Sequence, residues 1–294
     1  MTATISKRNF LKFAMGSGLA LGSCASAVAR VATDDMKWDK TTDVLVLGFG
    51  GAGASAAIEA KKKGADVLIL EKMPQPGGNT AVSAGGFMCP DDEAKAYEYL
   101  KGTYTYSHAE MDEALLRTFC REVMDLKNFV TGLGENTKLF VYGYAGFKNL
   151  PGQEVIKRYR VHGQKGGPKK GAGDCLFDVL KGAVEKAGIE YMTETPVVEM
   201  IRKSDMVVGV VAKHKGPYYA LELWPTLVNT QGGPRRDEKA RIVSALGKTI
   251  PRLYGAGELG SMWGPIYQGA CNNAEALVFW RIAGRNAADE KLWC

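Results

Sequence analysis

The chain has 294 residues, 46% of them hydrophobic and 24% charged, which is the composition of an ordinary globular protein with one large or two modest domains. The formal charge is +6, but the first 29 residues hold three basic and no acidic side chains, so the charge falls to +3 without them. That excess is too small to favour nucleic acid as a partner. The six cysteines form no CxxC pair and the three histidines are far apart, so the sequence predicts no metal site, covalent haem or cysteine-ligated cluster.

Residues 1–29 are typical of an export signal. Ser6–Lys12, SKRNFLK, resembles the twin-arginine pattern S-R-R-x-F-L-K and departs from it at Lys7. Phe13–Ala29 is uncharged, but it is short and diluted by Gly and Ser, which suits a signal segment better than a spanning helix. The closing AVA is a plausible cleavage site, whereas LGSC resembles a lipoprotein box that would leave Cys24 acylated at a membrane surface. We expect export to the periplasm or the outer face of the cytoplasmic membrane, as a soluble or a lipid-anchored form.

A polar leader, residues 30–42, precedes the strongest motif of the chain. Val44–Leu47 is short and apolar, as in a buried parallel strand, and Gly48–Gly53, GFGGAG, follows it directly. An Ala-rich helix then reaches Lys63, and Asp66–Leu70 predicts a second strand that ends at Glu71. Strand, glycine turn, helix, strand and acidic residue is the order of a dinucleotide-binding unit.

The residues of this unit have distinct expected roles. Gly48 permits the tight turn, Gly50 lets the backbone approach a pyrophosphate, and Gly53 lets the helix pack close to the strand. The helix N-terminus faces the phosphate charge. Glu71 lies about 20 residues further on, where a carboxylate can accept hydrogen bonds from the ribose. This unit alone does not decide which dinucleotide binds.

A second glycine loop follows Glu71. Residues 76–80, PGGNT, and 83–86, SAGG, combine glycine pairs with Asn and hydroxyl side chains. Such a loop can press its backbone against a flat or charged ligand, and an ordinary surface loop is the alternative interpretation.

Helices are predicted at Asp91–Leu100 and at Ala109–Thr131, the second starting from a capping box at Ser107–Glu110. A basic stretch, residues 155–173, has no acidic residue; it is either a solvated loop or a cationic rim that attracts anionic substrates or phospholipid headgroups. Next comes a helix capped by Asp174. Three predicted strands follow and would extend the sheet begun at Val44: Ile189–Thr193, Val197–Ile201 and Val207–Ala212.

The last third contains a predicted strand, Pro225–Thr230, and a strand that leads into a second glycine turn, Lys248–Glu258, KTIPRLYGAGE. Tyr267–Asn273 then precedes a helix from Ala274 to about Lys291. A helix N-terminus offers unpaired N–H groups and partial positive charge. A flavin needs such a group beside its pyrimidine carbonyl, where negative charge builds up on reduction.

Four motifs, GFGGAG, GGNTAVSAGG, IPRLYGAGE and VFWRIAG, together resemble FAD-dependent oxidoreductases of the fumarate reductase/succinate dehydrogenase flavoprotein family, which includes soluble fumarate reductases, urocanate reductases and 3-ketosteroid dehydrogenases. The resemblance implies an α/β fold: a Rossmann-like FAD-binding domain with a central parallel sheet and a small β-hairpin extension. It favours FAD over a nicotinamide, because GGNT and GAGE serve the flavin half. The FAD contacts that it implies are Gly48, Gly50, Gly51, Ala52, Gly53, Glu71, Lys72, Gly77, Gly78, Asn79, Thr80, Ser83, Gly85, Gly86, Val198, Gly257, Glu258, Asn273, Ala274, Ala276 and Leu277.

The chain departs from this family in two places. The family's strand ending in ATGG and its capping domain have no counterpart, so residues 43–212 and 225–294 would form the two parts of the FAD-binding domain around a junction at 213–224. An Arg that clamps a substrate carboxylate in fumarate reductases is replaced by Tyr267. A phenol donates one hydrogen bond and cannot form the bidentate pair of Arg, so a dicarboxylate substrate is not expected. Tyr267 is our candidate for polarising a carbonyl or donating a proton, with structural packing as the alternative.

Two functions remain open. The first is an enzyme that reduces or desaturates a C=C bond conjugated to a carbonyl by hydride transfer involving flavin N5. Its substrate would be a small unsaturated carbonyl or carboxylate, and its electrons would come from a separate cytochrome or quinol system. The second is an FAD-binding but catalytically incomplete chain, either a remnant or one piece of a split enzyme. In this second case the missing strand would expose part of the sheet as an unpaired edge, which favours association or instability.

Overall fold

The computed structural model describes residues 2–6, 30–32, 36–107, 110–162, 172–214, 232–257, 259–260, 262–263 and 269–291. Most of the predicted export signal, the predicted strand at Pro225–Thr230, and the candidates Glu258 and Tyr267 lie outside these residues. No helix within the described ranges is long and apolar enough to cross a membrane.

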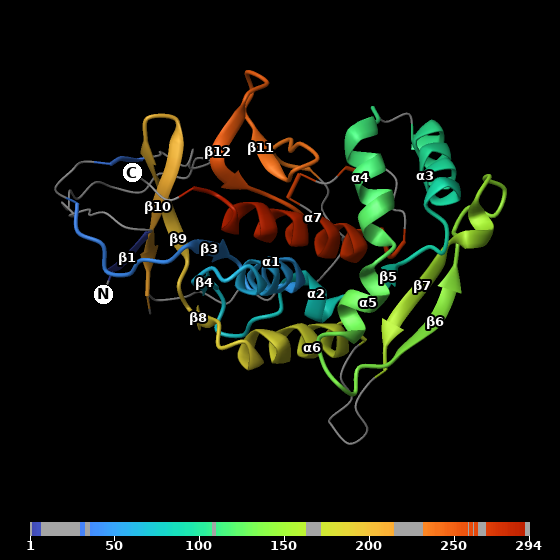
Figure 1. The fold of residues 1–294 in the computed structure, drawn as a ribbon, viewed down its shortest axis with the longest axis horizontal. Helices are drawn as coiled ribbons and strands as arrows, with labels where there is room; N and C mark the ends of the chain where they lie inside the picture. The colour runs from blue at the N-terminus through green and yellow to red at the C-terminus, as the bar shows by residue number, and fades with distance from the viewer. Residues whose placement is uncertain are drawn as a thin grey trace, which may run out of the picture.

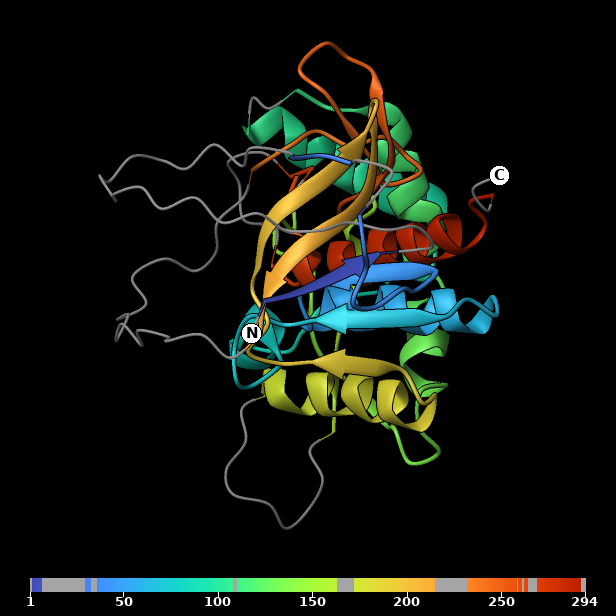
Figure 2. The ribbon, with the colours of Figure 1, turned by 90° about the vertical axis from the view of Figure 1, so that its left-hand side faces the viewer.

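The predicted strand–helix–strand unit is present. Strand β3 (Val44–Leu47) pairs in parallel with β4 (Val67–Leu70), and helix α1 (Gly51–Lys62) connects them. A third parallel strand, β8 (Glu190–Met192), lies on the other side of β4. The sheet order is therefore β3-β4-β8, with β4 fully buried at its centre (Figure 2).

Helix α1 lies between two long helices, α6 (Ala172–Lys186) and α7 (Cys271–Ala288) (Figure 1). The contact with α7 is close because small residues face each other across it. A Cβ on Gly284 of α7 would lie 2.2 Å from the carbonyl oxygen of Ala56 in α1. Helices α1 and α7, far apart in the sequence, thus share one hydrophobic core.

Several predicted helix ends are wrong. The helix predicted to start at the Ser107–Glu110 capping box begins instead at Glu113, and Asp112 caps it by accepting the N–H of Leu115. A charged carboxylate is a strong N-cap at the positive end of a helix. The helix predicted at Ala109–Thr131 is interrupted and forms two helices, α4 (Glu113–Val123) and α5 (Leu126–Thr131). The helix predicted at Asp91–Leu100 is longer than expected and forms α3 (Glu93–Ser107).

Two other helices start earlier than predicted. Asp174 is not a cap but lies in the first turn of α6, where its charge still favours the helix N-terminus. Helix α7 starts at Cys271, three residues before the predicted start at Ala274, and ends at Ala288. A short helix, α2 (Gly78–Val82), forms within the second glycine loop.

The predicted hairpin forms but does not extend the β3-β4-β8 sheet. Strands β9 (Val197–Lys203) and β10 (Met206–Lys213) pair antiparallel in a separate sheet of order β1-β10-β9-β2, and they run across the first sheet in Figure 2. The chain turns away after β8 at Glu194, which has a φ of 51°. The two outer strands of this sheet are β1 (Thr2–Ser6) and β2 (Arg30–Val31).

Two further antiparallel sheets complete the fold. One has the order β5-β7-β6 and lies beside α5; its strands are β5 (Phe87–Met88), β6 (Leu139–Tyr144) and β7 (Lys157–Val161), with a 3₁₀ turn, η1 (Gln153–Val155), before β7 (Figure 1). The other pairs β11 (Arg241–Val243) with β12 (Thr249–Tyr254), which confirms the strand predicted before the second glycine turn.

Candidate functional site

The two glycine loops cross at the end of β3. Gly50 and Gly77 form a parallel bridge, and the N–H of Gly77 donates to the carbonyl oxygen of Phe49 at 2.8 Å. The N–H of Gly51 donates to Thr80 Oγ1 at 3.2 Å. We call residues 48–53 together with residues 77–80 the glycine crossing.

Glycine is required in the crossing for space as well as for conformation. A Cβ on Gly53 would lie 1.9 Å from the carbonyl oxygen of Gly48, which excludes a side chain there, whereas one on Gly50 would make an ordinary contact at 3.4 Å with that of Gly77. Gly48 and Gly77 have φ angles of 101° and 134°, which side chains disfavour. Helix α1 starts here with no side-chain cap and no acidic residue in its first turn. This N-terminus is suited to an anionic group such as a pyrophosphate.

Glu71 is buried at the crossing. Its two carboxylate oxygens accept the N–H groups of Phe49, at 2.7 Å, and Met73, at 2.8 Å. The side chain therefore fixes the turn between β3 and α1. Each oxygen retains a further lone pair, so ribose hydroxyls can still donate to it.

The glycine turn that follows β12, which includes Gly257, also approaches the N-terminus of α1. A Cβ on Gly257 would lie 3.8 Å from Cβ of Ala52 in α1 and 3.7 Å from Cβ of Ala276 in α7. Gly257 has a φ of 76°. Backbone from three distant segments thus converges on the N-terminus of α1.

The start of α7 is tied to the loop after α2. Asn273 Nδ2 donates to the carbonyl oxygen of Gly86 at 2.9 Å and to Ser83 Oγ at 3.3 Å. The carbonyl oxygen of Ala270 accepts the N–H of Met88 at 3.1 Å. Ala270, the N-cap, has a φ of 64° and makes no side-chain cap, so the partial positive charge at the start of α7 has no capping side chain from this residue.

Most of the predicted FAD contacts therefore lie together, at the crossing, at Gly257 and at the start of α7. Ala274 and Leu277 are buried in the core instead, whereas Lys72 and Asn79 are exposed. Val198 lies on β9, outside the crossing, with 48% of its side chain exposed. The described contacts fit FAD: close backbone approach and two helix N-termini suit its phosphates and its pyrimidine ring.

A buried ion pair was not predicted. Arg236 Nη2 pairs with Glu275 Oε1 of α7, and the two side chains are 0% and 1% exposed. Arg236 Nη1 also donates to the carbonyl oxygen of Leu259 at 3.2 Å, and Glu275 Oε1 accepts the N–H of Met262 at 3.0 Å. The pair fastens the segment after Gly257 to α7. Only its three-dimensional position reveals it, because no sequence spacing links the two residues.

The described site offers binding groups but no reactive thiol. Burial raises the pKa of Cys89 and of Cys271, and it raises the pKa of Cys120 to about 12. These thiols stay protonated at neutral pH and are poor nucleophiles. Among the described residues there is also no His, Cys, Asp and Glu cluster that could hold a metal ion.

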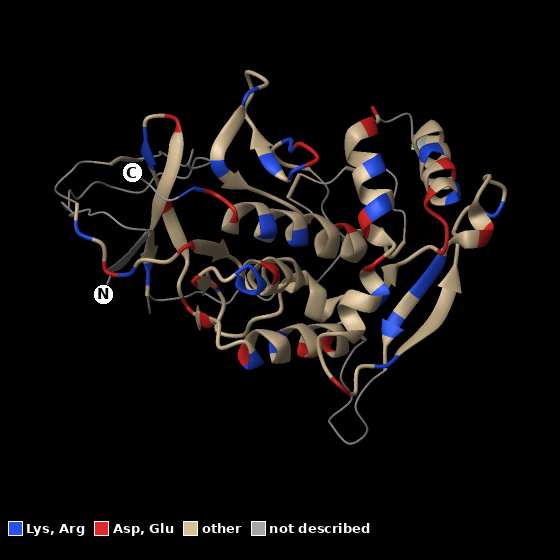
Figure 3. Cartoon of the chain, in the orientation of Figure 1, with Lys and Arg blue, Asp and Glu red and all other residues tan. Residues whose placement is uncertain are grey.

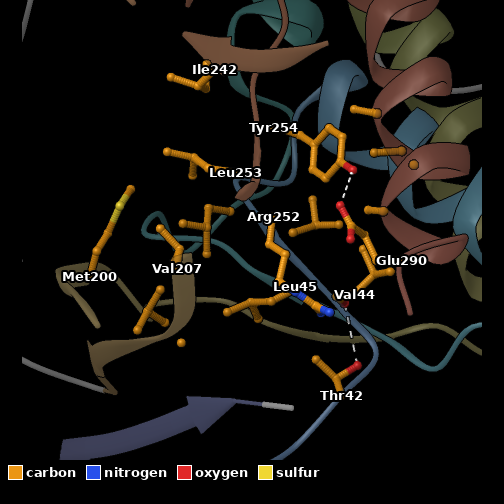
Figure 4. A pocket seen from close by; sticks show the side chains of 18 of the residues that line it. Thr42, Val44, Leu45, Met200, Val207, Ile242, Arg252, Leu253, Tyr254 and Glu290 are labelled. Atoms are coloured by element: carbon orange, nitrogen blue, oxygen red, sulfur yellow. Dashed lines mark hydrogen bonds between the residues drawn. The ribbon is translucent and has the colours of Figure 1, made fainter. Parts of the chain in front are cut away.

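An apolar groove of about 430 Å³ runs along the other side of β3 (Figure 4). We call it the edge groove. Its walls are β3 with the two residues before it (residues 42–47), the end of β12 (residues 252–254), part of β10, and Ala283 and Ala287 of α7. Among the described strands β3 pairs with β4 alone. None of the predicted FAD contacts lines this groove.

Comparison with known proteins identifies the fold of the crossing. The family model described as "FAD binding domain" matches residues 43–216 and 212–273, which is more than half of the chain. The acrylate reductase flavoprotein subunit of Shewanella woodyi is 34% identical over 53% of this chain and 32% of its own length. The 3-oxo-5-alpha-steroid 4-dehydrogenase of Comamonas testosteroni is 26% identical over 74% of this chain and 43% of its own length.

Solved structures share the fold. The 3-ketosteroid-Δ4-(5α)-dehydrogenase of Rhodococcus jostii matches with a TM-score of 0.73 and 15% identity, covering 89% of this chain and 100% of that one. A flavocytochrome c3 fumarate reductase in an open conformation matches with a TM-score of 0.65 and 17% identity, over 84% and 78% of the two chains. The chain spans less than half the length of the curated relatives named above. It belongs to the FAD-binding domain family of the fumarate reductase and ketosteroid dehydrogenase flavoproteins, and its cofactor is FAD.

Proposed function

We propose that this protein is an FAD-dependent oxidoreductase that reduces, or in the reverse direction desaturates, a C=C bond conjugated to a carbonyl. The observation that carries the proposal is the convergence of the glycine crossing, Gly257 and the start of α7. Bound FAD supplies hydride chemistry at its N5 position. The relatives support this class, since they include an acrylate reductase and a steroid dehydrogenase.

The chain's own residues would bind and orient. The first turn of α1 would hold the pyrophosphate and Glu71 the ribose. The partial positive charge at the N-terminus of α7 would favour the negative charge that a flavin gains on reduction. Tyr267 is the predicted proton donor, because a tyrosine phenol is generally protonated at neutral pH and can act as an acid.

The substrate would be a small unsaturated carbonyl or carboxylate, and electrons would come from a separate redox partner. A relative named fumarate reductase (cytochrome), from Shewanella frigidimarina, supports a cytochrome as that partner. A quinol system is the alternative.

The test begins with the flavin spectrum of the purified full chain. Oxidation of a reduced dye is then followed with fumarate, urocanate, cinnamate-type acids and enones as acceptors. We expect bound FAD and turnover of at least one acceptor. Tyr267→Phe should keep the flavin spectrum and lower turnover; unchanged turnover would remove Tyr267 from the mechanism.

A second candidate is an FAD-binding chain without independent turnover, and the open edge groove favours it. Bound FAD with no turnover on any acceptor would support this candidate and contradict the first. A chain that binds no FAD would contradict both.

We also propose export through residues 1–29. The full chain, expressed in bacteria with and without a twin-arginine translocase, should reach the periplasmic fraction only when the translocase is present. Cys24→Ala would then separate a lipid-anchored form, which this variant releases from membranes, from a soluble form, which it leaves unchanged. Equal export without the translocase would contradict a twin-arginine signal.

A further inference from the structure

Strand β7 presents two arginines on one face. Arg158 and Arg160 alternate along the strand with Tyr159, which is buried and stacks on Phe87. Side chains two residues apart on a strand share a face, about 7 Å apart. The two guanidinium groups therefore point away from the core that holds Tyr159. Figure 3 shows basic residues along β7.

Neither arginine has an anionic partner within the described part of the chain. The neighbouring Lys157 is paired with Asp91, but no hydrogen bond or ion pair joins Arg158 or Arg160 to a described residue. Both Nε atoms are buried without an acceptor. Two half-buried guanidinium groups side by side, each with a buried Nε that has no acceptor, point to a ligand that supplies negative charge.

Arg158 lies beside the start of α7. A Cβ on Gly269, next to the α7 N-cap, would be 3.1 Å from its Cζ, and one on Gly146 would be 3.0 Å from its Nη2. The charge of Arg158 also reaches buried Cys271, where it opposes the increase in thiol pKa that burial causes. This guanidinium is therefore close to the helix end that we expect to face the flavin.

Arg160 lies over a neighbouring part of the same surface. A bulge in β6 between Val141 and Gly143 leaves Tyr142 outside the regular pairing, and Arg160 Cζ lies 3.9 Å from the centre of its ring. The Tyr142 hydroxyl occupies the space beside Gly86, where an added Cβ would be 2.0 Å from it. Gly86 is the residue that Asn273 of α7 binds.

We propose that Arg158 and Arg160, the β7 arginine pair, bind the carboxylate of the substrate. The proposal rests on the proposed function and narrows it: the substrate is a small α,β-unsaturated carboxylate rather than a neutral enone. Guanidinium groups match carboxylates in shape and charge, and pair with them by parallel hydrogen bonds. The pair would supply, from the FAD-binding domain itself, the positive charge that Tyr267 cannot provide.

The experiment is a calorimetric titration of the full chain as isolated, with acrylate and with its neutral analogue acrylamide as probes. Arg158→Gln with Arg160→Gln should weaken acrylate binding at least about tenfold, the scale of a lost charged hydrogen bond. Acrylamide binding should not change. Lys157→Gln is the matched control, because it removes a cation of the same strand that already has a carboxylate partner.

Three results would overturn the inference: no acrylate binding by the unmodified chain, an unchanged acrylate affinity in the double variant, or an equal loss in the lysine control. Circular dichroism of each variant identifies misfolding, and Arg158→Lys with Arg160→Lys, which keeps the charge, should recover part of the affinity. Turnover of enones without acrylate binding would overturn the arginine site and leave the proposed function standing. Acrylate binding by a chain that holds no FAD would contradict the proposed function and leave the arginine site standing.

Discussion

The two edges of β3 differ sharply. On one edge every residue of β3 faces a partner in β4, and the strand leads into the glycine crossing, where backbone segments approach so closely that an added Cβ would overlap a carbonyl oxygen. On the other edge lies the edge groove, apolar and bounded by a second strand edge, β12. The segments that we expect to hold FAD are tightly packed, whereas the sheet edge beside them has no partner among the described strands.

This difference bears directly on function. The crossing, Gly257 and the start of α7, where we propose that FAD binds, lie together in the fold. The proposed turnover would also depend on the groove side, where the described strands provide no partner for the second edge of β3. Perturbing each edge separately will show how far FAD binding depends on the groove side.

The largest effect is expected at the ion pair that links the two regions. Arg236→Met would remove the cationic partner of the buried Glu275 carboxylate, which should lower the free energy of unfolding by about 3–5 kcal/mol. Urea unfolding measures the loss. Replacing both residues by methionine should recover most of it, because apolar groups of similar size often substitute for buried pairs without cost. A double variant as unstable as the single one would mean that the charges themselves hold Leu259 in place.

A smaller loss in the free energy of unfolding is expected for a substitution within the glycine crossing. Gly53→Ala would place a methyl group 1.9 Å from the carbonyl oxygen of Gly48, so the backbone must move, at a cost of about 1–3 kcal/mol. The ratio of flavin to protein absorbance should fall with it. The matched control is Gly182→Ala in α6, where nothing lies within 4 Å; it should stabilise the helix by about 0.5–1 kcal/mol. Full flavin retention in the Gly53 variant would contradict a tight crossing.

The comparison also explains what sequence could predict. The crossing follows from a local order of strand, glycines and helix, so Val44–Leu47, Gly53 and Glu71 could be placed from the sequence alone. The start of α4 was missed because Asp112 competes with a nearby capping box, and sequence patterns do not rank the two. The sheet to which the hairpin belongs, and the pairing of Arg236 with Glu275, depend on long-range packing that no spacing encodes.

Filling the edge groove should raise the free energy of unfolding modestly, in contrast to the two losses above. Ala287 of α7 lines the groove, and Ala287→Leu would add apolar surface to it. If the space is open, the larger side chain should raise the free energy of unfolding by about 1 kcal/mol, the value of one or two buried methylene groups. If another segment or another chain fills the groove, the same substitution would overpack it and destabilise the protein. The urea midpoint of this variant therefore distinguishes an open edge from an occupied one.

The smallest effect concerns Tyr254, whose side chain lines the groove and donates to Glu290 Oε1 at 2.7 Å. Burial, followed by this hydrogen bond, raises the pKa of Tyr254. In the unfolded chain the phenol loses its proton near pH 10, whereas in the folded chain it keeps it. The stabilisation is therefore complete below pH 10 and is lost as the pH rises further, because only the unfolded state then gains from deprotonation.

Tyr254→Phe should reduce the fall in urea midpoint between about pH 8 and about pH 11. Because the pKa of buried Tyr104 is raised as well, part of the fall should remain. An unchanged fall in the Phe variant would mean that the groove side is more open to water than its apolar walls indicate.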